Sequence, residues 1–235
     1  MSGYGSAWNH PERIRGKPMK IMFRVLVMES ILAAILFTSA GRVDLPWFWA
    51  VMGLHAALLV TGIRFMDPGL REERLRPGPG GRSRQIRFLA LPMILAHLVV
   101  AGMDVGRFGW SGPIPFLVQA AALAGYSAAM GLSLWAMAAN RFFSPVVRIQ
   151  AERGHRVVTV GPYAYLRHPG YTGLIVGSVC GGVALGSWWS LVPLAPLVGM
   201  FLWRTSMEDR FLHEGLEGYV GYARRVPYRL VPGLW

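Results

Sequence analysis

Residues 21–40 are IMFRVLVMESILAAILFTSA, an apolar stretch interrupted only by Arg24 and Glu29. A helix of this length covers roughly 30 Å, the thickness of the hydrocarbon core of a bilayer. Five more apolar runs follow, at residues 47–63, 88–105, 114–139, 171–185 and 188–203. The last two runs are short, and only residues 186 and 187 separate them. The sequence therefore predicts an all-α integral membrane protein with about six transmembrane helices, of which the last two form a short helical hairpin.

The composition supports this class. Of the 235 residues, 53% are hydrophobic and 15% are charged, whereas soluble proteins average about 25% charged residues. The formal net charge of +12 would suggest a nucleic-acid partner if the chain were soluble. The single cysteine, Cys180, excludes an internal disulfide and a cysteine-based zinc site, and the sequence predicts no metal site.

The basic residues follow the topology of the predicted helices. Only Arg42 and Arg107 lie on one side of the membrane, and the other Lys and Arg residues share the opposite side. By the positive-inside rule that side is cytoplasmic, and it holds both termini. The charge therefore indicates topology and contact with anionic membrane lipids, and it predicts no nucleic-acid partner. An arginine-rich, lysine-poor composition suggests a bacterium of high G+C content, hence a bacterial inner-membrane protein.

Several residues inside the predicted helices are unusual for a membrane interior. Glu29 is either functional or paired with a neighbouring residue, and the sequence does not decide between these. Lone histidines such as His55 and His97 more often pack inside a bundle than bind a ligand. Glycines at 173, 177 and 181 form a smooth helical face that permits close helix packing. The connector 66–87 contains the run PGPGG at 77–81 and is predicted to be flexible.

Polar residues that could take part in binding or catalysis concentrate in two stretches on the predicted cytoplasmic side, residues 150–171 and 204–235. Gly161-Pro162 and His168-Pro169 interrupt helices, so the polar side chains around them lie at the mouth of the helix that follows. Arg204 and Glu208 are four residues apart and share one helical face. Such residues are either ordinary membrane anchors with a plain helix ion pair or parts of a site, and the spacing alone fits both.

The order of motifs in these stretches resembles the isoprenylcysteine carboxyl methyltransferase family. The resemblance covers the C-terminal part of the chain, while residues 1–140 resemble the family only in forming membrane helices. The matching positions are Gly161-Pro162-Tyr163, Arg167-His168-Pro169-x-Tyr171-x-Gly173, Arg204-x-x-x-Glu208-Asp209-x-x-Leu212 and Tyr219-x-x-Tyr222-x-x-Arg225-Val226-Pro227. The family usually has a second glutamate where this chain has Asp209. Because Glu208 matches the cofactor-binding glutamate, we expect this change to have little effect.

The resemblance implies an integral membrane enzyme that uses S-adenosylmethionine, in a pocket built from the 141–170 loop, the last hairpin and the C-terminal tail. It implies one membrane methyltransferase domain, residues 1–235, with four N-terminal helices in 1–140 and the cofactor-binding region in 141–235. Arg204 matches the arginine that faces the methyl acceptor. The implied cofactor contacts are Gln150, His155, Arg156, Val157, Val158, Tyr163, His168, Pro169, Gly170, Tyr171 and Glu208.

The chemistry of these residue types suits methyl transfer. In such a reaction the main task of the protein is to align donor and acceptor. A carboxylate acceptor is already ionised at neutral pH and requires no general base. Arg204 and Arg167 are then expected to orient that carboxylate, with Glu208 completing the predicted catalytic set. The predicted acceptor is a lipophilic small molecule or a lipid-modified substrate of the isoprenylcysteine type.

Other activities remain open at this point. A phospholipid amine or a small thiol is an alternative acceptor, and an amine would need Glu208 or His168 as a base. Membrane sterol reductases, which use NADPH, resemble the chain around Arg167 to Gly173. They usually have asparagine and an acidic residue where this chain has Gly170 and Leu174, which favours methyl transfer. A membrane scaffold without enzymatic activity gives no reason for the clustered polar residues.

Overall fold

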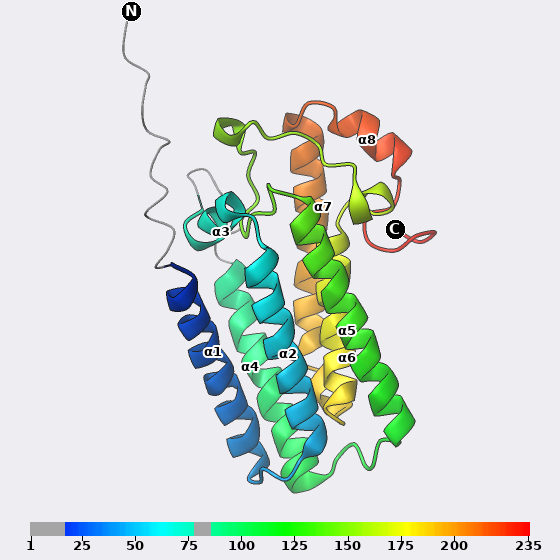
Figure 1. Cartoon of the computed structure of the whole chain (residues 1–235). Coiled ribbons are helices and arrows are strands. Elements are labelled where there is room, and N and C mark those ends of the chain that lie inside the picture. The colour runs from blue at the N-terminus through cyan, green and yellow to red at the C-terminus, as the bar shows by residue number, and fades with distance from the viewer. Residues whose placement is uncertain (1–16, 78–85) are drawn as a thin grey trace, which may run out of the picture.

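The protein is an elongated helical bundle in a computed structural model that describes residues 17–77 and 86–235 (Figure 1). The expected all-α class is confirmed for these residues. The α-helices are α1 (Lys17–Ala40), α2 (Pro46–Phe65), α3 (Pro68–Leu75), α4 (Ile86–Met103), α5 (Phe116–Ala139), α6 (Pro169–Ala184), α7 (Leu194–Gly215) and α8 (Tyr219–Arg225). The long helices run side by side, and α3, α8 and the loop between α5 and α6 gather at one end.

Four segments of the described chain are long and apolar enough to cross a membrane: Met22–Ala40, Pro46–Phe65, Phe88–Phe108 and Phe116–Ala139. They match the first four runs found in the sequence. The fifth run corresponds to α6, which has 16 residues and is short for a bilayer. The sixth corresponds to the start of α7, whose second half carries charged residues. Length and composition thus support four of the six expected spans.

The sixth run differs from its prediction. Residues 188–203 were expected to form one helical arm, but Trp189–Leu191 is a short 3-10 turn and α7 begins only at Leu194. Proline is tolerated in the first turn of a helix and disrupts its interior, so Pro193 and Pro196 place the start of α7 here. The helix then continues past Trp203, because its Arg204, Thr205 and Asp209 are buried in the folded protein.

The expected flexible connector contains a helix. The Asp67 side chain accepts a hydrogen bond from the Leu70 amide (2.9 Å) and caps the N-terminus of α3. Glu73 on α3 is buried and pairs with Arg148 of the α5–α6 loop, with an N–O distance of 2.6 Å. The prediction of flexibility is therefore wrong for residues 68–75, while residues 78–85 lie outside the described chain.

The glycine face of α6 packs directly against α5, as expected. A Cβ atom at Gly173 would lie 2.2 Å from Ser133 Oγ and 2.4 Å from the Ala129 carbonyl oxygen. The Ser133 hydroxyl also donates to the Gly170 carbonyl (3.1 Å). Close contact between these helices fixes the start of α6, where the candidate site lies.

We expect Gly173→Ala to destabilise the protein by about 1–3 kcal/mol, because the added methyl group has no space against α5. Gly199→Ala on α7 is the matched control, since a Cβ there meets nothing within 4 Å; alanine should be neutral or stabilise the helix by up to about 1 kcal/mol. Thermal unfolding of the purified variants in detergent measures both. Equal melting temperatures for the two variants would contradict the proposed packing.

Candidate functional site

A cavity of about 280 Å³ lies at the end of the bundle that carries α3 and α8. Its wall is made by Arg74 of α3, the loop from Asn140 to Val158, the segment from Tyr163 to Leu174, the second half of α7, and two tyrosines of α8. The wall is mostly aromatic and aliphatic, with several arginines and the carboxylate of Glu208. Apolar cavities with a few convergent polar groups are typical ligand sites.

The structure brings most of the residues singled out in the sequence to this cavity. Those that line it are His155, Arg156, Val157, Val158, Tyr163, Arg167, His168, Gly170, Tyr171, Arg204 and Glu208. Gln150 and Pro169 do not. Gln150 is fully buried, and its side-chain amide donates to the Phe142 carbonyl (2.7 Å). Pro169 is buried at the first position of α6. Both residues are therefore buried outside the lining of the cavity.

Gln150 instead positions a neighbouring ring. Its backbone N–H donates to Nδ1 of His155 (3.2 Å), whose ring stacks on Phe142 with centroids 4.5 Å apart. Burial, together with the charges of Arg148 and Arg153, lowers the pKa of His155 to about 4. The ring is therefore neutral at neutral pH, and Nε2 carries its proton.

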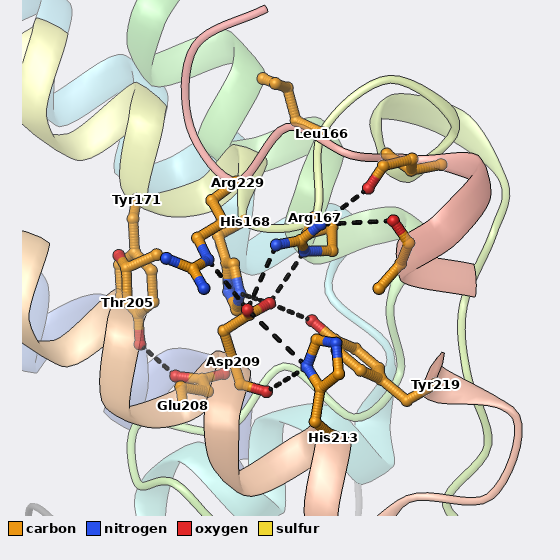
Figure 2. Close-up of polar contacts among 12 residues, drawn as sticks. Leu166, Arg167, His168, Tyr171, Thr205, Glu208, Asp209, His213, Tyr219 and Arg229 are labelled. Carbon is orange, nitrogen blue, oxygen red and sulfur yellow. Dashed lines mark hydrogen bonds and ion pairs between the residues drawn. The ribbon is translucent and has the colours of Figure 1, made fainter. Parts of the chain in front are cut away.

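Arg204, Tyr171 and Glu208 form a hydrogen-bonded line along the cavity. Arg204 Nε donates to the Tyr171 hydroxyl (2.6 Å), and that hydroxyl donates to Glu208 Oε2 (2.6 Å; Figure 2 shows the second bond). Arg204 also donates to the Pro145 carbonyl (2.8 Å). The shared helical face predicted from the i, i+4 spacing therefore holds a cation and an anion, but the hydroxyl of a tyrosine from α6 lies between them.

Asp209, adjacent to Glu208, does not line the cavity and lies in a buried cluster of polar side chains (Figure 2). It is 1% exposed. Its Oδ1 accepts from Arg167 Nε (2.8 Å) and the Tyr219 hydroxyl (2.8 Å), and it lies 3.3 Å from His168 Nε2. Its Oδ2 accepts from Arg167 Nη2 (3.2 Å) and Arg229 Nε (2.9 Å). One carboxylate thus joins α7, α8, the start of α6 and the C-terminal tail.

The surroundings of Asp209 stabilise its ionised form. Burial disfavours the charge, but hydrogen bonds from His168 and Arg167 outweigh burial and hold the pKa of this carboxyl well below its ordinary value. Burial, followed by the charge of Asp209, raises the pKa of the Tyr219 hydroxyl well above its usual range. Tyr219 therefore remains a hydrogen-bond donor to a permanent anion.

Arg167 contacts the C-terminal tail that follows α8. Besides Asp209, its Nη1 donates to the carbonyls of Val226 and Pro227, both at 2.9 Å. Its backbone N–H donates to the Tyr228 carbonyl (3.0 Å). A guanidinium whose donors point to these partners has little left for a ligand. These contacts favour an anchoring role for Arg167 over the expected role of orienting the acceptor.

Sequence reasoning missed two features of this region. Asp209 was noted only as a replacement for glutamate, although residues one position apart on a helix point about 100° apart. This difference in direction, together with Arg167, His168 and Arg229 in the two polar stretches, is the signal that could have revealed the buried cluster around Asp209. The second feature is the Glu73–Arg148 pair, which brings α3 to the cavity; nothing local in the sequence links residues so far apart.

Comparison with known proteins finds similarity in the part of the chain that includes much of the cavity wall. Residues 122–214 match the sequence pattern of the Isoprenylcysteine carboxyl methyltransferase (ICMT) family. The matched segment is less than half of the chain. It includes α6, the Arg204–Tyr171–Glu208 line and Asp209, and it begins within α5. The residues that form α1 to α4 lie outside the matched segment.

Individual methyltransferases are similar to part of this chain. Protein-S-isoprenylcysteine O-methyltransferase B of Arabidopsis thaliana is 36% identical over 91 residues, which is 38% of this chain and 46% of the relative. Protein-S-isoprenylcysteine O-methyltransferase of Schizosaccharomyces pombe is 30% identical over 95 residues, 38% of this chain and 39% of the relative. The alignments thus cover less than half of either relative.

Asp209→Asn should lower the free energy of unfolding by about 3–5 kcal/mol, because it leaves the buried Arg167 without its charge partner. Asp44→Asn is the matched control: Asp44 also pairs with an arginine, Arg42, but on the surface, and its loss should leave the melting temperature unchanged. Thermal unfolding in detergent checks both. Similar melting temperatures for both variants would show that the buried cluster does not stabilise the fold.

The same carboxylate predicts a pH dependence. Since folding lowers the pKa of Asp209, its stabilisation is complete above the ordinary aspartate pKa of about 3.9 and is lost as the pH falls below that value. The melting temperature of the wild type should therefore drop more steeply below about pH 4 than that of Asp209→Asn. Parallel pH profiles for the two proteins would refute this assignment.

Proposed function

We propose that the protein is a methyltransferase that uses S-adenosylmethionine and acts where the membrane meets the cytosol. The observation that carries this proposal is the Arg204–Tyr171–Glu208 line, which places an anion and a cation in one apolar cavity. The family match over residues 122–214 supports methyl transfer. When bound, S-adenosylmethionine supplies an electrophilic methyl group on a sulfonium sulfur.

The residues at the cavity suit such a donor. Glu208 offers a carboxylate for the donor's ammonium group: Tyr171 donates to Oε2, and Oε1 has no hydrogen-bond partner among the described residues. The ring of Tyr163 and the side chains of Val157 and Val158 give apolar walls for an adenine. His155 is neutral and can donate a hydrogen bond from Nε2 without adding charge.

Arg204 is the residue we assign to the methyl acceptor. Arg204 is 5% exposed and lines the cavity, and its guanidinium donates to Tyr171 and the Pro145 carbonyl. A guanidinium fixed in this way presents a set geometry to a carboxylate. Arg167, which contacts Asp209 and the tail, acts in this proposal as a positioning residue for His168 and the start of α6.

The acceptor proposed is the carboxylate of an isoprenylcysteine-like or other lipophilic molecule. Glu208 is the only carboxylate that lines the cavity in the described part of the chain, and it serves the donor. With Glu208 engaged by the donor, His168 is the remaining base for a protonated amine. An acceptor that is already ionised needs no base, and it is the one we propose. The names of the relatives agree with a lipid-modified substrate.

The position of the cavity and of the arginines also supports a membrane placement. The cavity lies at the end of the bundle that carries most of the arginines, which the positive-inside rule assigns to the cytoplasm. We propose an integral protein of a bacterial inner membrane with both termini on that side. Arg74, from the N-terminal half, lines the cavity, so residues 1–140 and 141–235 are proposed to act as one domain.

The nature of the donor is tested by calorimetric titration of the purified protein in detergent. We expect S-adenosylmethionine to bind and NADPH not to bind. Binding of NADPH alone would replace the proposal by a reductase of the sterol type. A turnover screen with methyl-labelled donor and prenylcysteine, lipid-amine and thiol acceptors then identifies the acceptor; methylation of the amine or thiol only would refute the carboxylate.

Glu208→Gln and Arg204→Ala should separate the two ends of the site. Loss of a charged hydrogen bond costs about 1.5–3 kcal/mol, so Glu208→Gln should weaken donor binding about 10-fold to 100-fold. Arg204→Ala should bind the donor nearly as the wild type but turn over about 100-fold more slowly, because the acceptor loses its alignment.

Glu214→Gln is the matched control for these variants, since Glu214 is an exposed glutamate on the same helix. It should leave both donor affinity and turnover unchanged. Wild-type donor affinity in Glu208→Gln would refute the role of Glu208, and full turnover in Arg204→Ala would refute that of Arg204.

A further inference from the structure

Three polar side chains form a line within the apolar part of the bundle, and none of them lines the cavity. Glu29 comes from α1, His55 from α2 and Tyr126 from α5. His55 Nδ1 lies 2.7 Å from the Tyr126 hydroxyl, and His55 Nε2 lies 3.5 Å from Glu29 Oε1. Each of the three residues lies near the middle of its candidate membrane span.

Glu29 is the unusual member of this line. It is 7% exposed, and neither carboxylate oxygen has a hydrogen-bond partner of ordinary geometry among the described residues. A carboxylate at this depth in a membrane is costly and marks a functional position by default. Its nearest charged or chargeable neighbour is the ring of His55.

The charge of the group argues for an added proton. At neutral pH, isolated side chains of these types carry one negative charge, that of the glutamate, since a free histidine is mostly neutral and tyrosine is neutral. One proton, held either by the His55 ring or by the Glu29 carboxyl, makes the group electrically neutral. The interior of a membrane strongly favours the neutral total.

Among the residues that the structure describes, no other charged group near Glu29 can supply this compensation. Helix α4, which packs on α1, presents His97 in its membrane stretch, but that ring bonds to the Ser190 carbonyl (2.9 Å). Asp104 and Arg107 lie at the far end of that span and bond to Ser111 and Ser39. Arg24, on α1 itself, is exposed more than one turn away.

We propose that Glu29, His55 and Tyr126 form an intramembrane proton-binding site that holds one added proton at neutral pH. The tyrosine hydroxyl and the carboxylate lie on opposite edges of the His55 ring, so the ring couples α1 to α5 through α2. This site does not depend on the activity proposed above, because none of its residues lines the cavity.

Two measurements on the wild-type protein locate the proton. Nitrogen-15 NMR of labelled histidine rings reports whether His55, assigned with His55→Gln, is an imidazolium at neutral pH. A hydrophobic carbodiimide reports a protonated Glu29: the carboxyl oxygen bonds to the carbodiimide carbon, the proton goes to a nitrogen, and an acyl shift gives a stable N-acylurea found by peptide mass spectrometry. An imidazolium at His55 or an adduct at Glu29 supports the site.

His97 is the internal control, since it is a membrane histidine without a carboxylate partner and should stay neutral. Glu29→Gln keeps the size of the side chain and should remove both the imidazolium and the adduct. A neutral His55 ring together with an unmodified Glu29 in the wild type at neutral pH would overturn the proposal. So would an imidazolium at His55 that persists in Glu29→Gln without any adduct in the wild type.

Discussion

The buried carboxylate of Asp209 is the point on which the end of the bundle that carries the cavity depends. It connects segments that are far apart in sequence, because Arg167, Tyr219 and Arg229 all donate to it. Arg167 and Asp209 are both largely shielded from water and are stable only together, since each would be costly to bury alone, whereas Arg229 is partly exposed. The short helix α8 and the C-terminal tail are thereby held against the start of α6.

This arrangement explains why adjacent acidic residues have different roles. Asp209 is surrounded by cations and stays ionised, and it holds the frame. Glu208 faces the cavity with Tyr171, within reach of a ligand. Because Arg204 is fixed to the same tyrosine hydroxyl, the frame also sets the separation of the cation and the anion. A site of this kind relies on positioning, which is the main contribution that alignment of two reactants requires.

Much of the fold could be predicted from the sequence, because long apolar runs have few alternatives to a membrane helix. Prolines and local charges led to wrong predictions where tertiary contacts decide the local structure. Helix α7 extends through charged residues because they are buried, and α3 forms because Glu73 pairs with Arg148. Motif resemblance singled out loops that the structure brings to one cavity. It could not separate ligand contacts from supports such as Gln150 and Arg167, because that distinction depends on where each side chain points.

The most direct test is a structure of the full chain determined with S-adenosylmethionine. We predict that the donor occupies the cavity, with its ammonium group hydrogen-bonded to Glu208 and its methyl group directed toward Arg204. A donor bound elsewhere on the protein, or bound in the cavity with Glu208 still contacting only Tyr171, would contradict the proposed site.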